Sequence, residues 1–453
     1  MRNRLLHLPF YTRSRRGLKL LPLLALLLLS QAAAAQWTLQ PFAFDTPQVF
    51  AYHFGIVSNN VVWALGYDED AVNRSVVLST NGGQSWARRA VGPLAPDEYI
   101  RGLSATSATS AWVCTVRTAS PGGRVLHTAD GGLTWAVQPG AQFSTSTPNF
   151  VHFFTANDGV AVGDPLNAPT DPFDIFVTHD GGTTWGRAAS VPAPLPDENG
   201  VVLTPAVVGN SIWFATDESR VFRSTDQGTT WTAAVANTTS SEMYAVAFQD
   251  ALHGVALSVN DVTRTLFEHA TVDGGLSWQR VFYTGPLLSN GITGVPGTGL
   301  LLSVGAGDLT ATDLGSSYSA DNGATWVPLE TTRQHTGIAA RGAGAVWSGA
   351  VLGSTALGAY RLDATVLSRS PARVLPPLAA YPNPSADGWF RLPLPAAAAT
   401  VRVVDAVGRE VLRTTTAAGR AELALDLRGQ RAGLYLLTLE TAARQARQQL
   451  VVQ

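Results

Sequence analysis

The residues of this chain with the clearest chemical potential recur in a fixed frame. Six segments follow the pattern [S/T]-x-[D/N]-x-G-x-[S/T]-W, from Ser79–Trp86 to Ser319–Trp326. A carboxylate flanked by hydroxyls has the composition of a catalytic acid, but six copies on six separate turns cannot converge on one site. An Asp or Asn side chain that accepts backbone N–H bonds, followed by a glycine at positive φ, is typical of a tight β-hairpin turn. We therefore predict a structural role for the defining residues of these boxes, namely Asn81, Gly83, Trp86, Asp130, Gly132, Trp135, Asp180, Gly182, Trp185, Asp226, Gly228, Trp231, Asp273, Gly275, Trp278, Asp321, Gly323 and Trp326.

The spacing of the boxes predicts the fold. Their tryptophans lie 49, 50, 46, 47 and 48 residues apart, which is a repeat of supersecondary size. Upstream of each box runs a short apolar segment, such as Ala111–Cys114 or Gly254–Leu257, that indicates a strand buried on both faces. A further strand precedes it, as at Phe150–Phe154. Each repeat therefore holds about four antiparallel strands, which is one blade of a β-propeller.

The two ends of the repeat region indicate how the ring closes. Trp37 lies 49 residues before Trp86 and is in phase with the other tryptophans, although no box precedes it. At the other end, 333–367 contains strands with no box and no outer strand. We therefore expect residues 36–42 to complete a seventh blade, which would remove the free sheet edges. Six and eight blades are the alternatives.

This topology predicts where a ligand would bind. The boxes join the third and fourth strands, so the loops between strands two and three, and between blades, lie on the opposite face. Propellers commonly bind ligands there, around the central channel. The ligand-face candidates are Arg117, Arg124, Asp164, Asp171, Asp174, Asp217 and Arg220.

Composition argues against several other functions. Hydrophobic residues make up 45% of the chain and charged residues 14%, which indicates a large packed core. Residues 36–453 carry 25 arginines and 33 acidic residues, so nucleic acid is not an expected partner. The single cysteine, Cys114, lies in an apolar segment and excludes an intrachain disulfide, and the eight histidines show no metal-ligand spacing. We expect no metal and no cofactor.

The first 35 residues have the pattern of an export signal. Basic residues such as Arg15 and Arg16 precede a leucine-rich run from Leu20 to Leu29, and small residues follow at 32–35. An apolar run of about ten residues is too short to span a bilayer. We therefore predict a signal peptide over 1–35 and no transmembrane anchor.

The C-terminal segment differs in composition from the repeats. We expect a propeller over 36–368, a Pro-rich linker over 369–380 and a separate domain over 381–453. That last region contains short alternating strands, for example Phe390–Leu394 and Leu434–Leu439, separated by turn residues. The whole chain is thus predicted to be all-β, a seven-bladed propeller with Asp-box turns followed by a small Ig-like β-sandwich.

Both regions resemble known families. The boxes resemble those of the BNR or Asp-box propeller superfamily, which includes sialidases, xyloglucanases, the sortilin ectodomain and the photosystem II assembly-factor family. The tail resembles the type A C-terminal sorting domain of the type IX secretion system, with its signal expected at Tyr381, Pro382, Asn383, Pro384, Gly408, Gly433 and Tyr435. The resemblance implies the type IX machinery as a partner and export through the periplasm to the outer cell surface or the medium.

Two functions remain open at this point, because one fold supports many activities. The first is a non-catalytic module that binds a glycan, a peptide or an envelope protein. The second is a secreted glycoside hydrolase of sialidase or xyloglucanase type, which would need a pair of carboxylates for acid and base catalysis. The rim loops offer many acidic residues, and the sequence selects no pair among them.

Overall fold

The structure is a computed structural model, and it describes most of the chain after the leader. The described residues are 36–44, 49–67, 73–119, 122–143, 146–201, 204–237, 242–260, 262–307, 310, 312–353, 355–368, 373–374, 380–394, 398–405, 409–441 and 444–453. The predicted signal peptide over 1–35 lies outside them.

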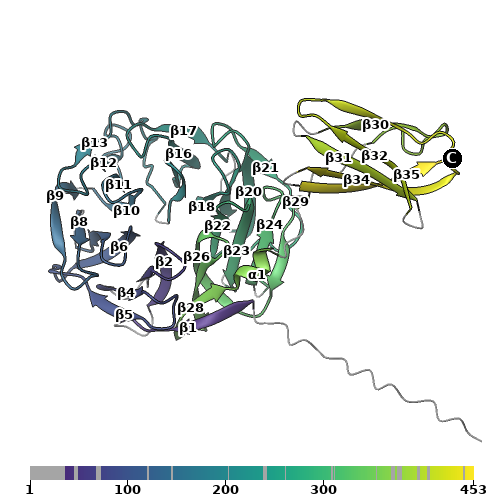
Figure 1. The fold of residues 1–453 in the computed structure, drawn as a ribbon. Coiled ribbons are helices and arrows are strands. Elements are labelled where there is room, and N and C mark those ends of the chain that lie inside the picture. The colour runs from purple at the N-terminus through teal and green to yellow at the C-terminus, as the bar shows by residue number, and fades with distance from the viewer. Residues whose placement is uncertain are drawn as a thin grey trace, which may run out of the picture. The chain divides into compact units, whose positions relative to one another are not determined.

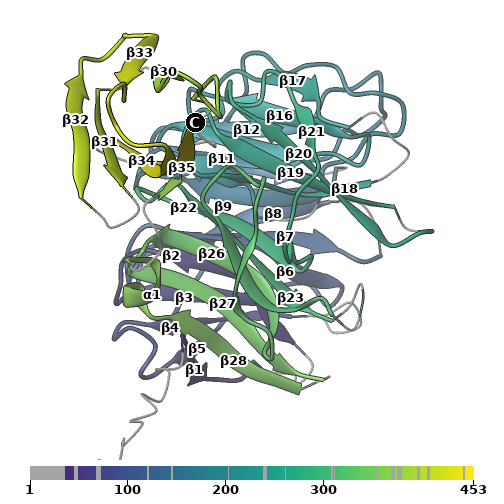
Figure 2. The same ribbon diagram turned by 90° about the vertical axis from the view of Figure 1, so that its right-hand side faces the viewer.

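Seven four-stranded antiparallel sheets form a ring around a central channel (Figure 1). Seen from the side, the strands of each sheet run between the two faces of the ring (Figure 2). Blade 1 has β2 (Phe50–Ile56), β3 (Val62–Tyr67), β4 (Ser75–Ser79) and β5 (Ala87–Ala90); blade 2 has β6 (Glu98–Ala105), β7 (Ala111–Arg117), β8 (Gly123–Thr128) and β9 (Ala136–Phe143); blade 3 has β10 (Pro148–Phe153), β11 (Gly159–Gly163), β12 (Asp174–Thr178) and β13 (Gly186–Arg187); blade 4 has β14 (Ala206–Val208), β15 (Ser211–Ala215), β16 (Arg220–Ser224) and β17 (Thr232–Val235). Blade 5 has β18 (Glu242–Phe248), β19 (Gly254–Asn260), β20 (Thr265–Thr271) and β21 (Gln279–Val281); blade 6 has β22 (Gly291–Val295), β23 (Leu300–Ala306), β24 (Leu314–Ser319) and β25 (Val327–Glu330); blade 7 has β26 (Gln334–Gly342), β27 (Ala345–Leu352), β28 (Thr355–Leu362) and β1 (Trp37–Pro41).

The ring closes with the N-terminal strand, as predicted. Strand β1 pairs antiparallel with β28, with Trp37 opposite Leu362. The Trp37 side chain is 1% exposed, and its indole N–H donates to Ser316 Oγ of blade 6 at 2.8 Å. One strand from the start of the chain therefore completes the last blade and also contacts the blade before it.

The second strand of each blade is buried on both faces, which explains its continuous apolar sequence. In β7, for example, Ala111 to Val116 are all buried between neighbouring blades. Cys114 lies in this strand and is fully buried, and burial raises the pKa of its thiol to about 12. It is a small core residue, and no nucleophilic role is expected for it.

The six boxes are the turns between the third and fourth strands, and they share one hydrogen-bond pattern. In the third box the Thr178 hydroxyl donates to Asp180 Oδ1 at 2.9 Å and accepts the Gly182 N–H at 2.9 Å. Asp180 also accepts the Thr184 N–H and hydroxyl, at 2.8 and 2.6 Å, and Gly182 has φ = 92°. These hydrogen bonds, chiefly those from Thr184, lower the pKa of Asp180 to about 2. The carboxylate is thus an acceptor that closes a turn.

Each box also contacts the blade that precedes it. In four of the six boxes the carbonyl of the first glycine accepts a side-chain N–H from that blade: Gly82 from Arg361, Gly131 from Arg89, Gly181 from Trp112 and Gly274 from Trp213. A Cβ added at Gly228 would lie 2.7 Å from Val160, so the glycine is required by close packing as well as by its φ of 91°. The boxes therefore join neighbouring blades.

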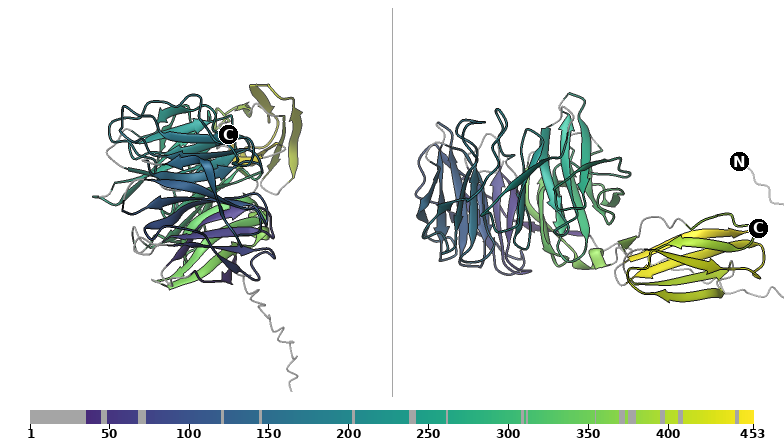
Figure 3. Two further views of the ribbon diagram at one scale, coloured as in Figure 1. Left: turned by 90° about the vertical axis from the view of Figure 1, so that its left-hand side faces the viewer. Right: turned by 90° about the horizontal axis from the view of Figure 1, so that it is seen from above.

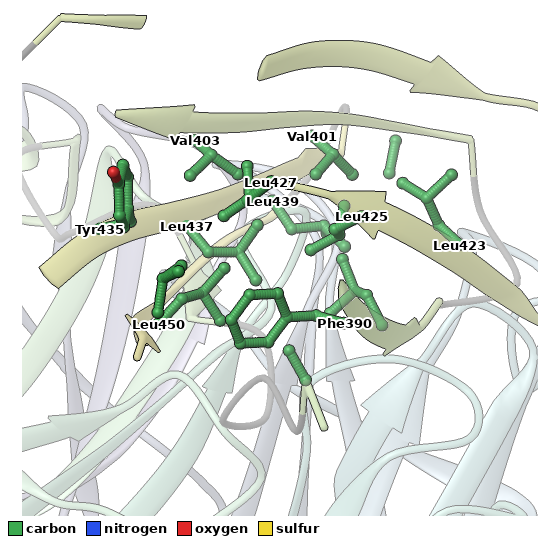
Figure 4. Close-up of a cluster of buried hydrophobic side chains, with 14 residues drawn as sticks. Phe390, Val401, Val403, Leu423, Leu425, Leu427, Tyr435, Leu437, Leu439 and Leu450 are labelled. Carbon is green, nitrogen blue, oxygen red and sulfur yellow. The ribbon is translucent and has the colours of Figure 1, made fainter. Parts of the chain in front are cut away.

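The C-terminal region is a two-layer β-sandwich, as predicted (Figure 3). One sheet has the order β29-β35-β34-β31-β32, and the other pairs β30 with β33. Fourteen buried residues, among them Phe390, Val401 and Leu450, form its core (Figure 4). The strands of the sandwich are β29 (Arg373–Val374), β30 (Trp389–Pro393), β31 (Ala399–Asp405), β32 (Glu410–Thr416), β33 (Glu422–Asp426), β34 (Gly433–Thr441) and β35 (Arg444–Val452).

Helical structure in the described residues is limited to α1 (Ala364–Ser368), which follows the last propeller strand. It is far shorter than a membrane span, and no described helix is long and apolar enough to cross a bilayer.

The first prediction tests ring closure. A chain that begins at residue 43 lacks the outer strand of blade 7 and should yield little folded protein. Trp37→Ala keeps the strand but removes a fully buried indole, so we expect a loss of about 3–5 kcal/mol in the free energy of unfolding. Leu39→Ala, on the same strand but 40% exposed, should cost less than about 1 kcal/mol. Equal urea midpoints for the two variants would contradict the role assigned to β1.

The second prediction tests the box network. Thr178→Val keeps the side-chain volume but leaves the buried Gly182 N–H without its acceptor, so unfolding should become easier by about 1–3 kcal/mol. Asp180→Asn should lower the melting temperature less, because the first box functions with Asn81, whose Oδ1 accepts the Ser85 N–H at 3.0 Å. A larger effect for Asp180→Asn than for Thr178→Val would show that the charge, and not the hydroxyl, holds the turn.

Candidate functional site

Two of the predicted rim arginines hold the loop that leads into the inner strand of their blade. In blade 2, Arg124 donates from Nε and Nη2 to both carboxylate oxygens of Glu98, at 2.8 and 2.7 Å. The Thr115 hydroxyl donates to the same carboxylate, and the Ala95 N–H closes the turn on it at 3.0 Å. Burial opposes ionisation of Glu98, but the hydrogen bonds from Arg124 and Thr115 lower its pKa overall.

Blade 4 repeats this arrangement. Arg220 donates to both oxygens of Glu198, which is fully buried, and Thr216 and the Leu195 N–H bind the same carboxylate. Both of these arginine–glutamate pairs occur where the sequence is Pro-Asp-Glu, at 96–98 and at 196–198. The repeated Pro-Asp-Glu tripeptide is thus a sequence signal for these two arginine–glutamate pairs.

The other rim candidates also make contacts within the chain. Arg117 forms a bidentate ion pair with Asp97. Asp164 accepts Asn149 Nδ2 at 2.6 Å and the Gly200 N–H at 2.8 Å, and burial raises its pKa. The remaining contacts join Asp171 to Asn167, Asp174 to Ser146 and Arg187, and Asp217 to Asn199. All seven candidates thus brace the loops of this face, and a direct role in ligand binding stays a prediction.

The inner strands of the blades share an irregularity that the sequence does not reveal. Near the start of several inner strands the register with the second strand shifts, so that one or two residues of the inner strand lie outside the aligned register. The shifted residues are Tyr52 in blade 1, Arg101 in blade 2, Asn149 in blade 3, Tyr244 in blade 5, and Thr336 with Gly337 in blade 7. A β-bulge of this kind re-aims a side chain, and bulges often lie beside functional sites. We call these residues the bulge ring.

Three members of the bulge ring carry buried polar atoms that have no hydrogen-bond partner in the described part of the chain. They are Arg101 Nε, Asn149 Oδ1 and the Tyr244 hydroxyl. Buried polar groups are nearly always paired, so such atoms call for an explanation. The residue types of the inner strands do not reveal these atoms, because a register shift depends on how two strands pair.

The channel contains a cavity of about 320 Å³, lined by the second halves of the inner strands. Its walls include Phe54, Leu103, Phe154, Ile292 and Ile338 together with His53 and His152. A smaller cavity of about 40 Å³ lies at the bulge ring, beside Tyr52, Tyr244 and Asn290. The cavity residues do not include any of the seven predicted rim candidates.

The two channel histidines are neutral at physiological pH. Burial lowers the pKa of both to about 4, and the nearby Arg101 guanidinium contributes at His53. The His53 Nδ1 atom lies 2.9 Å from the Thr204 hydroxyl, which comes from a blade three places along the ring. Among the described residues, no three His, Cys, Asp or Glu side chains gather as metal ligands.

Two residues of the predicted sorting signal, Asn383 and Gly433, bind the final strand of the sandwich. Asn383 donates to the Gln449 carbonyl at 2.7 Å and accepts the Val451 N–H at 2.9 Å. Tyr381 donates to Glu422, and Tyr435 donates to the Arg431 carbonyl at 2.7 Å. Gly433 pairs with Val452, Pro382 and Pro384 flank Asn383, and the predicted Gly408 lies outside the described residues.

Comparisons with known proteins match both regions. Residues 379–453 match the secretion system C-terminal sorting domain, and residues 112–265 match the photosynthesis system II assembly factor YCF48. No curated protein sequence matches the chain.

Three solved structures are among those similar to this chain. YCF48 bound to D1 peptide is 15% identical over 72% of this chain and 95% of that chain, with a TM-score of 0.51. YCF48 from Cyanidioschyzon merolae is 16% identical over 72% and 98%, with a TM-score of 0.48, and an ancestral GH74 enzyme is 15% identical over 92% and 64%, with a TM-score of 0.48.

The first of these similarities supports the propeller fold, and the two family matches identify the parts. The chain is therefore a YCF48-like BNR β-propeller joined to a type IX C-terminal sorting domain, and it is exported to the cell surface or the extracellular space.

Proposed function

We propose that the propeller is a non-catalytic binding module that engages a peptide or a segment of an envelope protein outside the cell. The observation that supports this most is the channel cavity, whose volume of about 320 Å³ lies at the lower end for ligand sites and whose lining combines apolar side chains such as Phe54 and Leu103 with polar groups. Such a mixed lining suits a peptide, which presents both apolar side chains and backbone hydrogen-bonding groups.

Two glutamates in the loops that lead into the inner strands, on the face opposite the boxes, support a binding function over catalysis. Glu98 and Glu198 are each held by an arginine, a threonine and a backbone N–H, so their lone pairs are largely occupied. A general acid must deliver a proton to substrate, and these carboxylates face protein donors. They serve to hold the loops.

The fold is also compatible with peptide recognition. YCF48, whose propeller resembles this one at 15% identity, has been solved bound to D1 peptide. A glycoside hydrolase remains the competing function. The two functions can be told apart by measurement, because only an enzyme would release sugar from its substrate repeatedly.

The third prediction tests this function directly. The mature chain should bind members of a synthetic peptide array reversibly and should release no reducing sugar from xyloglucan or sialyl-oligosaccharide. Leu276→Ala changes an exposed side chain in the box turn of blade 5, on the face away from the predicted ligand loops, and should leave peptide affinity within about twofold. Repeated release of sugar by each protein molecule would replace the binding proposal with the hydrolase.

The fourth prediction concerns export. Leu450 is fully buried in β35, which lies between β29 and β34, so Leu450→Asp should unfold the sorting domain and trap the protein in the periplasm. Gln449→Asp places the same charge on an exposed position of that strand and should leave export intact. Cell fractionation in a host with the type IX machinery would show the compartment in which each variant accumulates. Surface delivery of the Leu450→Asp protein would mean that folding of the tail is not needed for sorting.

A further inference from the structure

The channel cavity lies toward the box face of the propeller, which is the face that carries the Asp-box turns. The second halves of the inner strands line it, and these strands lead into the turns between the first and second strands of each blade. Those turns contact the boxes, since the Asn60 carbonyl accepts the Gly82 N–H and the Thr109 carbonyl accepts the Gly131 N–H, both at 2.9 Å. The cavity is therefore on the side away from the rim loops that carry the predicted ligand-face residues.

On the rim side, a side-chain contact crosses the channel. The Thr204 hydroxyl, which precedes the inner strand of blade 4, lies 2.9 Å from His53 Nδ1 in the inner strand of blade 1. Thr204 lines both the channel cavity and the smaller cavity at the bulge ring, so it lies between them. A ligand that came from the rim face would meet this contact before it reached the larger cavity.

On the box side, the channel cavity adjoins a hollow between blades 1 and 7. Residues 57–60 of blade 1 line this hollow together with Arg341, Gly342 and Ala345 of blade 7. Arg341 also lines the channel cavity, and its Nη1 atom donates to the carbonyl of Ile56, another residue of the cavity wall, at 3.4 Å. Arg341 therefore lies where the two spaces meet, and we call this place the box-face mouth.

Arg341 supplies the charge of the channel cavity. The described residues of the lining include no Asp or Glu, and the two histidines of the lining, His53 and His152, are neutral. The Arg341 side chain is exposed, and the described part of the chain supplies no carboxylate that pairs with it. A hollow of one charge sign with walls of low dielectric constant concentrates the field, so the mouth attracts anions.

We infer that the propeller binds an acidic segment of a peptide through the box-face mouth, with an Asp or Glu side chain on Arg341 and an adjoining apolar side chain in the channel cavity. This inference rests on the proposed binding function and names its ligand chemistry and its face of entry. An arginine and a carboxylate form charge-assisted hydrogen bonds, which are about twice as strong as neutral ones. Apolar lining residues such as Ile56 and Ile338 suit the adjoining side chain.

The binding experiment uses the mature chain and hexapeptides with one Asp or Glu between apolar residues. Both peptide ends are blocked, so that the side chain carries the only carboxylate, and each peptide is paired with its Asn or Gln counterpart. Fluorescence anisotropy should give about tenfold weaker binding for the amide counterparts. Arg341→Gln should weaken the acidic peptides by about 10- to 100-fold and bring the two forms within about twofold of each other.

Matched variants separate this site from a general effect of charge or fold. Arg280→Gln removes the same charge from β21, where the guanidinium lies 4.5 and 5.1 Å from the ring centres of Phe267 and Phe282, and it should leave the affinity within about twofold. Leu276→Ala, in a box turn on the outer half of blade 5, lines neither space and should also keep its affinity. Because Arg341 is exposed, Arg341→Gln should keep the melting temperature of the wild type.

Photo-crosslinking tests the face of entry. A hexapeptide with a benzophenone side chain next to its acidic residue should label residues 57–60 or 341–345, which mass spectrometry of the digested protein would identify. Labelling confined to the rim loops would overturn entry at the box face.

The outcomes distinguish this inference from the proposed binding function. Equal binding of acidic and amide peptides, or unchanged affinity in Arg341→Gln, overturns the acid site and leaves the binding function standing. Binding of oligogalacturonate that depends on Arg341, with no peptide bound, assigns the mouth to a glycan acid and overturns the peptide ligand. Binding of neither probe removes both proposals.

Discussion

The structure depends on one buried hydroxyl in each Asp-box. In the box of blade 3, Thr178 donates to Asp180 and accepts from Gly182, so a single side chain fixes both the carboxylate and the glycine of the turn. That turn then offers its own Gly181 carbonyl to Trp112 of blade 2. A single blade cannot bury both faces of its sheet, so contacts of this kind between neighbours are what make the repeat stable.

Ring closure fixes the positions of the inner strands at the centre of the propeller. Because β1 completes blade 7, no blade is free to move away, and the starts of the inner strands are held around a narrow channel. Register shifts at that level turn residues such as Arg101 and Tyr244 out of the ladder. The closed ring thereby keeps these polar groups in place even though hydrogen bonds do not satisfy all of them.

The sequence predicts the architecture well and the site poorly, for physical reasons. The box pattern, the phase of Trp37 and the apolar second strands each reflect interactions between residues that are near in sequence or regularly spaced, and the structure confirms all three. The two hydrogen bonds from Arg124 to Glu98 depend on how their side chains are oriented, and the composition of the loops does not reveal that orientation. Glu198 is likewise fully buried under Arg220, and its position in a charged loop does not indicate this burial.

Arg124 and Arg101 show why a count of charges on a face is a weak guide to a binding site. Both belong to blade 2, and both were available to a ligand as far as the sequence could tell. For Arg124 to bind an external anion it would have to leave Glu98, and breaking a buried pair of this type costs about 3–5 kcal/mol. Arg101 incurs no such cost, because no described acceptor has to be released and part of its guanidinium is already out of water. A count of charges on a face therefore does not show which cation a ligand can reach.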